Sequence, residues 1–122
     1  MITAVPSILL VEDDEGIRES LAELLKLEGY AVDTAVDGLD ALDKLKEGIL
    51  PRWVLMDLSM PRMGGRECLA QMRTHAEWKE IPVTFLSAAR QSQTESYANH
   101  VDYLEKPTDI SIVIAAAKKH CN

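Results

Sequence analysis

The chain has 122 residues, 47% of them hydrophobic, and a formal net charge of −7, a composition typical of one globular domain with a core of its own. The acidic balance argues against nucleic-acid binding, which needs a basic face. The two cysteines form neither a disulfide framework nor a metal-binding spacing, and no segment resembles a secretory signal or a membrane span. We therefore expect a cytoplasmic protein that does not insert into a membrane.

Patterns typical of strands and helices alternate along the first third of the chain. Residues 7–11, "SILLV", form a short continuous apolar run that predicts a buried strand. Asp14 or a neighbour can cap the helix that follows, and Gly29 can end it. The apolar stripe of this helix consists of Ile17, Leu21, Leu24 and Leu25. Residues 30–35 then predict a second strand.

The same alternation continues to the C-terminus. A second helical stripe consists of Leu39, Leu42, Leu45 and Ile49. The later elements are predicted as strand 53–56, loop 60–65, helix 67–73, strand 81–87, strand 101–105 and a last helix marked by Ile110, Val113, Ile114 and Ala117. Residues 89–100 have few apolar anchors and many mediocre helix formers, so we predict a short, irregular or mobile fourth helix with the lowest local stability in the domain.

Five alternations of strand and helix predict a parallel sheet with helices on both faces. Ligands of such sheets bind outside the carboxyl ends of the strands. The polar residues at those ends are Glu12, Asp13, Asp57, Ser87 and Lys106. Asp57 is the most informative of them, because a carboxylate placed directly after the buried run "WVLM" is hard to explain by structure alone.

These side chains suit a phosphoryl-transfer site. Three carboxylates repel one another, and a divalent cation relieves the repulsion; oxygen ligands favour Mg²⁺. Asp57 would keep one oxygen as a nucleophile toward phosphorus. The metal, the Lys106 ammonium, and the Ser87 hydroxyl with a nearby backbone N–H would then each take one phosphoryl oxygen.

Four segments carry a resemblance to a known family. The segments "ILLVEDDEGIRESL", "VLMDLSMPRMGG", "IPVTFLSA" and "DYLEKP" occur in the order and at the spacing of the receiver domain of bacterial response regulators, the CheY-like family of two-component signalling. The resemblance spans nearly the whole chain. It implies one receiver domain over residues 1–122 with no output domain, folded as a five-stranded, doubly wound, flavodoxin-like sheet of order 2-1-3-4-5.

The resemblance also implies roles for individual residues. Asp57 would be the phosphoacceptor, Glu12 and Asp13 the metal-side acids, and the backbone carbonyl of Ser59 a further Mg²⁺ ligand. Phosphoryl oxygens would be bound by Ser87, the N–H of Ala88 and Lys106. Ser87 and Tyr103 would form the switch pair, although Tyr103 by itself fits a half-buried packing residue equally well. Lys106–Pro107 would be a cis peptide.

The implied function is phosphorylation-controlled signalling. A histidine kinase or a histidine phosphotransfer protein would phosphorylate Asp57, and the surface of residues 89–100, the fifth strand and the last helix would change to control a partner or to form a homodimer. The domain itself would have at most self-phosphorylation and self-dephosphorylation activity. The sequence departs from the family in its signalling surface: the segment between Ser87 and Lys106 is short, the usual Gly-Ala before the fifth strand is absent, "PRMGG" lacks the common acid, and Thr108 replaces a common Phe.

Three other functions are weaker alternatives. A Mg²⁺-dependent phosphatase with an aspartyl-phosphate usually carries a general-acid Asp where this chain has Ser59, which cannot protonate a leaving group. A metal-dependent adhesion-type site needs a Ser where Pro61 stands. Nucleotide or flavin binding would need a glycine-rich phosphate loop after the first strand, where "VEDDEG" occurs instead.

Overall fold

The computed structural model describes residues 7–88, 101–106 and 109–121. The elements along the chain are β1 (Ser7–Val11), α1 (Glu15–Leu27), β2 (Ala31–Ala35), α2 (Gly38–Lys46), β3 (Trp53–Asp57), α3 (Gly65–Met72), β4 (Val83–Ala88), β5 (Val101–Lys106) and α4 (Ile110–Cys121). The fourth helix predicted at 89–100, the predicted Lys106–Pro107 cis peptide and Thr108 involve residues outside the described part of the chain.

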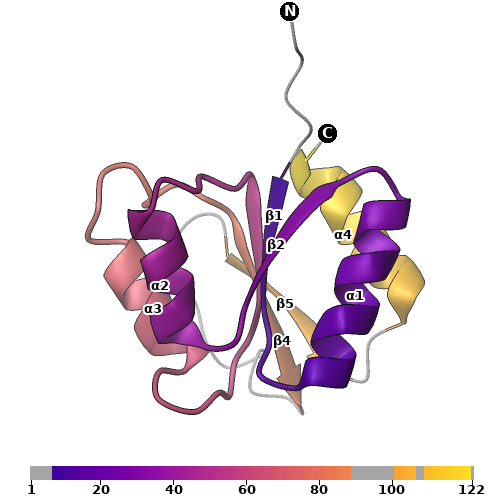
Figure 1. Cartoon of the computed structure of the whole chain (residues 1–122), viewed down its shortest axis with the longest axis horizontal. Helices are drawn as coiled ribbons and strands as arrows, with labels where there is room; N and C mark the ends of the chain where they lie inside the picture. Colours follow the sequence, from indigo (N-terminus) through magenta and orange to yellow (C-terminus); the bar gives the residue numbers. More distant parts are fainter. Residues whose placement is uncertain (1–6, 89–100, 107–108, 122) are drawn as a thin grey trace, which may run out of the picture.

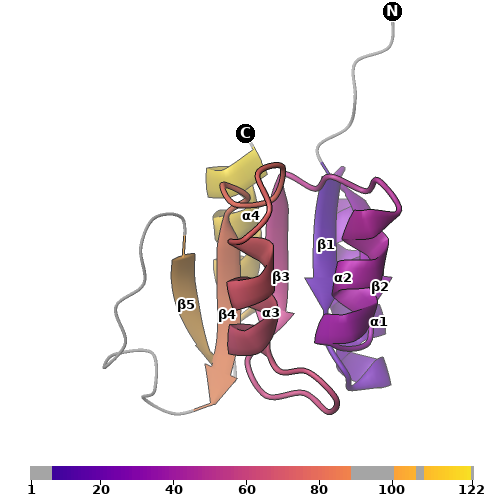
Figure 2. The same cartoon turned by 90° about the vertical axis from the view of Figure 1, so that its left-hand side faces the viewer.

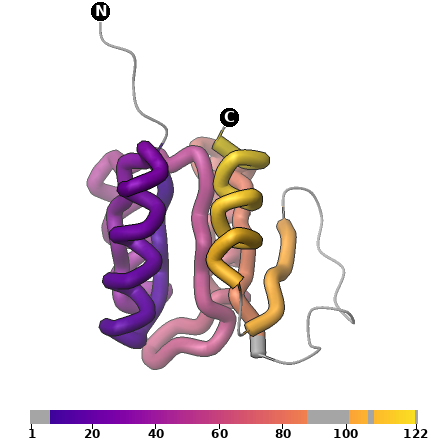
Figure 3. The backbone as a smooth tube through the Cα atoms, turned by 90° about the vertical axis from the view of Figure 1, so that its right-hand side faces the viewer, coloured from indigo at the N-terminus to yellow at the C-terminus, as the bar shows by residue number. Residues whose placement is uncertain are grey.

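The five strands form one parallel sheet of order β2-β1-β3-β4-β5, as predicted. The sheet lies between two helical layers, with α2 and α3 on one face and α1 and α4 on the other (Figure 1). Turning the molecule shows the strands side by side behind α2 and α3 (Figure 2) and the opposite layer of α1 and α4 in front of them (Figure 3).

The sheet is buried on both faces because its central strands are apolar at successive positions. All four residues from Trp53 to Met56 are fully buried in β3, as expected for a strand covered by helices on both sides. Alternation along the strand sends Val54 and Met56 into the cluster beneath α2 and α3, and Trp53 and Leu55 into the cluster beneath α1 and α4.

The structure corrects the predicted helical stripes. Ile17 and Leu24 of α1 are 42% and 37% exposed, and Leu39 of α2 is 38% exposed. The buried residues of α1 are Ala22 and Leu25. The apolar stripe of each helix is wider than the face that contacts the sheet. The angle at which the helix docks on the sheet decides which of its apolar residues are buried.

Element boundaries follow from local chemistry. The Asp14 side chain caps α1 by accepting a hydrogen bond from the Ile17 amide at 2.9 Å. Gly29 ends the same helix at φ 101°, a conformation that favours glycine. β3 is one residue longer than predicted and includes Asp57, and β4 extends to Ala88.

Candidate functional site: an acidic pocket at the carboxyl end of the sheet

The carboxyl ends of β1 and β3 bring three acidic side chains together. Val11 of β1 is in register with Met56 of β3, so Glu12 and Asp57 come next on neighbouring strands. One carboxylate oxygen from each of Glu12, Asp13 and Asp57 lies within 4.8 Å of the others. The prediction that these carboxylates converge is therefore confirmed, and such a cluster could hold a metal ion.

A lysine from the edge strand faces this cluster. Lys106 Nζ, at the end of β5, lies 3.2 Å from Asp57 Oδ1 and 3.7 Å from Glu12 Oε1. Glu12 is 1% and Asp57 7% exposed, whereas Asp13 is exposed. A single ammonium therefore lies beside two buried carboxylates, and the third carboxylate of the cluster is exposed to solvent.

The environment of Glu12 disfavours its charged form. Burial raises the pKa of Glu12 to about 7, and the neighbouring charge of Asp57 acts in the same direction, against the Asp14 amide and Lys106. Glu12 Oε2 accepts a hydrogen bond from the Asp14 amide at 3.1 Å. Among the described residues, no group forms a hydrogen bond with the buried Oε1. An oxygen-only donor set that includes a buried carboxylate oxygen without a hydrogen bond fits a hard cation such as Mg²⁺.

Ser87 and Tyr103 lie on the sheet face that α2 and α3 cover. Asp57 is in register with Leu86, so Ser87 follows directly on the neighbouring strand, and it is 2% exposed. Phe85 lies two residues earlier on β4 and packs against Tyr103, with ring centroids 5.3 Å apart. Tyr103 is half-buried in this arrangement. The packing expected of Tyr103 is confirmed, and its role as a switch stays a prediction.

The other two predicted contacts, to the metal and to the phosphoryl group, come from the backbone. Ser59 is exposed in the loop between β3 and α3, and Ala88 pairs with Lys106 in the β4–β5 ladder. The backbone of both residues is therefore near the same edge of the sheet. Their roles toward a metal or a phosphoryl group stay predictions.

Sequence reasoning missed a residue that supports Glu12. Arg18 Nη1 donates a hydrogen bond to the Glu12 backbone carbonyl at 2.8 Å, from the first turns of α1. This contact fixes the backbone that carries the buried carboxylate. The sequence places this arginine one helical turn after the cap residue Asp14. Arginines at such positions are also common on solvent-exposed helix faces, so the pattern by itself does not predict the contact.

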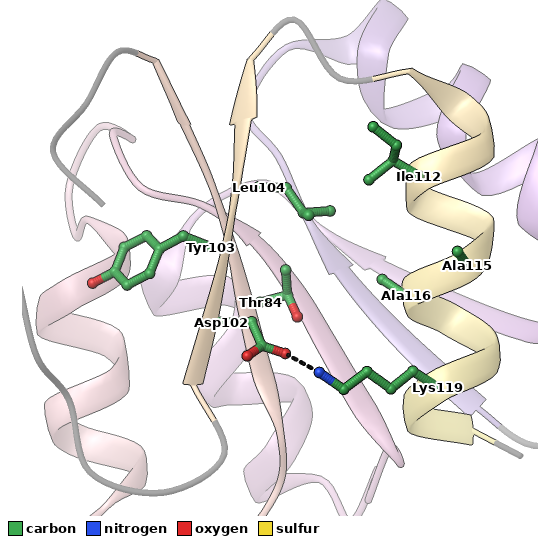
Figure 4. A pocket seen from close by; sticks show the side chains of 8 residues that line it. All are labelled: Thr84, Asp102, Tyr103, Leu104, Ile112, Ala115, Ala116 and Lys119. Atoms are coloured by element: carbon green, nitrogen blue, oxygen red, sulfur yellow. Dashed lines mark hydrogen bonds and ion pairs between the residues drawn. The ribbon is translucent and has the colours of Figure 1, made fainter. Parts of the chain in front are cut away.

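A cavity of about 400 Å³ lies between β5 and α4, apart from the cluster of Glu12, Asp13 and Asp57. Figure 4 shows Leu104 pointing toward α4 and Tyr103 pointing to the opposite side of β5. At the cavity, Lys119 Nζ of α4 lies 3.5 Å from Asp102 Oδ2 of β5. The acidic pocket and this cavity are separate features, because none of the three clustered carboxylates lines the cavity.

Comparison with known proteins identifies the family. A model of the response regulator receiver domain matches residues 8–118. The chain belongs to this family. Among curated proteins, the response regulator MprA of Mycobacterium sp. (strain KMS) is 38% identical over 112 residues, which are 88% of this chain and 47% of MprA. The chain thus spans about half the length of this relative.

Solved structures of receiver domains have the same fold. The chemotaxis response regulator CheY4 of Vibrio cholerae superposes with a TM-score of 0.83 at 26% identity, covering 95% of this chain and 98% of CheY4. The receiver domain of the hybrid histidine kinase CckA gives a TM-score of 0.80 at 30% identity, covering 95% of this chain and 99% of that domain.

The comparisons confirm the predicted family, the CheY-like fold and a role in two-component, phosphorylation-controlled signalling, and they do not favour the phosphatase alternative. In the described part of the receiver domain, no helix combines the length and the apolar character needed to cross a bilayer.

Proposed function

We propose that this receiver domain accepts a phosphoryl group on Asp57 from a histidine kinase or a histidine phosphotransfer protein. The observation that carries the proposal is the position of Lys106 Nζ, 3.2 Å from Asp57 Oδ1, at the pocket where the three carboxylates meet. Glu12, Asp13, Asp57 and the carbonyl of Ser59 would hold Mg²⁺. The ion, when bound, would neutralise the carboxylates and the phosphoryl oxygens.

Each residue of the site has a separate role in the phosphoryl transfer. An Asp57 carboxylate oxygen attacks phosphorus, the P–N bond to the donor histidine breaks, and the imidazole leaves with the electron pair. Lys106 exchanges its contact with the Asp57 carboxylate for one with a phosphoryl oxygen. The Ser87 hydroxyl and the Ala88 N–H bind another oxygen, so transition-state charge is spread over groups already in place.

The same groups connect phosphorylation to the signalling surface. Ser87 follows Phe85 by two residues on β4, and Phe85 is the direct neighbour of Tyr103 on β5. A movement of Ser87 toward the phosphoryl group would therefore alter the space available on the sheet face that Tyr103 shares. We infer that β5 and α4 contribute to the partner-binding surface, with homodimerisation as one use of it. In this scheme the domain is a phosphoacceptor and not an enzyme acting on other substrates.

The decisive experiment is intact-mass measurement after incubation with acetyl phosphate and Mg²⁺. The wild type should gain one phosphoryl group, and Asp57→Asn should gain none. Lys106→Ala should retain its circular dichroism spectrum and lose phosphorylation-dependent binding to its target. Full phosphorylation of Asp57→Asn at another residue would overturn the assignment of Asp57.

An acyl-phosphate mimic separates the receiver function from the phosphatase alternative. Beryllofluoride with Mg²⁺ should bind to the wild type in a 1:1 ratio and should prevent labelling of Asp57. A phosphatase would instead turn over phosphate esters and would be inhibited by the same mimic. Catalytic turnover of such esters, abolished in Asp57→Asn, would support the alternative.

A further inference from the structure

The loop after Asp57 contains a strained turn. Arg62 is the one non-glycine residue with a positive φ in the described part of the chain, at 63°. The Met63 amide donates to the Pro61 carbonyl across it at 2.6 Å, which makes a three-residue γ-turn. A γ-turn with a positive central φ is rare and strained. Such a conformation persists only where the surrounding structure holds it in place.

The buried carboxylate of the residue that caps α2 holds this turn. Arg62 Nε lies 2.6 Å from Asp37 Oδ2, and Arg62 Nη2 donates to Asp37 Oδ1 at 3.1 Å. Asp37 is 2% exposed and also caps α2 by accepting from the Asp40 amide at 2.9 Å. This is a bidentate, charge-assisted contact between a buried carboxylate and an arginine whose side chain is 59% exposed, and the bidentate geometry distinguishes it from an ordinary surface ion pair.

The backbones of α2 and the loop are in direct contact beside this ion pair. The Gly38 amide donates to the Met63 carbonyl at 3.1 Å. A Cβ on Gly38 would lie 2.7 Å from Met63 Cγ and 2.8 Å from Met63 O. The loop therefore packs directly against the first turn of α2. A side chain at position 38 would force the loop and the helix apart.

A backbone hydrogen bond closes the loop where α3 begins. The cap residue of α3 is Gly64, and within the described residues no side chain forms a capping hydrogen bond with that helix. The Gly65 amide donates to the Leu58 carbonyl at 2.9 Å. Ser59 lies between this contact and the Arg62 turn, so its backbone position depends on both.

We propose that Asp37 and Arg62 are positioning residues that hold the loop of residues 58–64 with the Ser59 carbonyl directed to the cation site, and that they thereby set the Mg²⁺ affinity of the acidic pocket. The proposal rests on the proposed function, since Ser59 is a ligand only within it. Neither side chain would contact the metal or the phosphoryl group. Loss of the pair would let the strained turn relax and would move a ligand, without changing the three carboxylates.

Four single variants test this role. Arg62→Ala removes the ion pair, and Arg62→Lys keeps the positive charge without the bidentate geometry. Asp37→Asn removes the charge but keeps an oxygen able to cap α2. Arg52→Ala is the matched control, because Arg52 is an exposed arginine immediately before β3, at the opposite end of the strand from Asp57. Circular dichroism and thermal unfolding establish that each variant is folded at the assay temperature.

Two readouts on the unphosphorylated protein are independent of activity. Calorimetric titration with Mg²⁺ should give a dissociation constant about tenfold higher for Arg62→Ala and Asp37→Asn, the size of effect seen when groups that orient metal ligands are lost. Arg62→Lys should have a smaller effect, and Arg52→Ala should match the wild type. Hydrogen exchange of the Gly38 amide should become faster in Arg62→Ala, since its acceptor is the Met63 carbonyl.

Phosphorylation kinetics with acetyl phosphate supply the third readout. The Mg²⁺ concentration for half-maximal rate should rise about tenfold in Arg62→Ala, while the rate at saturating Mg²⁺ should return to the wild-type value. The double variant Asp37→Asn/Arg62→Ala should be no worse than Arg62→Ala alone, because the two residues act through one contact.

The outcomes separate this proposal from the proposed function. A wild type that accepts no phosphoryl group and binds no Mg²⁺ would refute the proposed function. A wild type that does both, with folded Arg62→Ala and Asp37→Asn variants of unchanged Mg²⁺ affinity, would refute the positioning role alone. If Arg62→Ala does not fold, Asp37→Asn and Arg62→Lys decide the question by the same titration.

Discussion

At the scale of single residues, this receiver domain places carboxylates in two different buried environments. Glu12 lies among other acids, and its pKa is raised to about 7, first of all by burial. Asp37 is equally buried, and burial acts to raise its pKa too, but the hydrogen bonds from Arg62 and the Asp40 amide outweigh burial and hold the pKa below its usual value. Asp37 has a bidentate arginine partner, whereas Glu12 shares the single ammonium of Lys106 with Asp57.

The lowered pKa of Asp37 predicts a specific acid sensitivity. A group whose folded pKa is depressed stabilises the fold above its unfolded value, and this contribution is lost as the pH falls through the folded pKa. The difference in unfolding free energy between the wild type and Asp37→Asn should therefore be constant from pH 7 to pH 5 and should shrink as the pH falls below 3.8. Urea denaturation across this range measures it, and a difference that stays flat would contradict the prediction.

At the scale of elements, the position of Asp57 depends on the close approach of α3 to the end of β3. Gly65 begins α3, and a Cβ there would lie 2.8 Å from the Asp57 carbonyl oxygen and 2.8 Å from Phe85 Cε1. The helix can therefore approach the backbone of the phosphoacceptor only because position 65 has no side chain. The same approach lets the Gly65 amide reach Leu58.

Gly65→Ala should consequently separate α3 from β3. We expect a loss of about 1–3 kcal/mol in unfolding free energy, typical of overpacking, together with slower phosphorylation of Asp57 at saturating Mg²⁺. Gly16→Ala is the control, since its nearest neighbour would be an Asp14 side-chain oxygen at an ordinary 3.4 Å and alanine favours a helix. Equal stability of the wild type and Gly65→Ala in denaturant titrations would contradict this prediction.

At the scale of the whole molecule, the acidic pocket links the metal to global stability. Three elements contribute to it, since Glu12 and Asp13 follow β1, Asp57 ends β3 and Lys106 ends β5. The pocket exists only when the sheet is folded. A cation bound there would stabilise the folded state without binding the unfolded chain to the same extent.

Thermal stability should therefore rise with millimolar-scale Mg²⁺. A tenfold excess over the dissociation constant contributes about 1.4 kcal/mol, which corresponds to a rise of about 5 °C in Tm for a domain of this size. The rise should vanish in Asp13→Ala, a change at an exposed side chain. Differential scanning calorimetry with and without Mg²⁺ measures both, and an unchanged response of Asp13→Ala would show that the ion binds elsewhere.

The sequence by itself determined the order of the elements, the parallel sheet and the acidic cluster. Each depends on a local pattern: apolar runs of strand length, glycines such as Gly29 at helix ends, and polar residues placed directly after strands. Parallel strands share one carboxyl edge, so Glu12, Asp57 and Lys106 had to converge once the strands were recognised. The receiver family followed from the same residues and is confirmed by comparison.

The tertiary structure alone decided which edge of each apolar stripe is buried and which distant residues meet. Ile17 and Leu24 have the hydrophobicity of core residues and remain exposed because α1 docks on the sheet through Ala22 and Leu25. The contact between Asp37 and Arg62 joins positions 25 residues apart. No local pattern predicts it, because the contact depends on how α2 and the β3–α3 loop pack together and not on the preference of either segment.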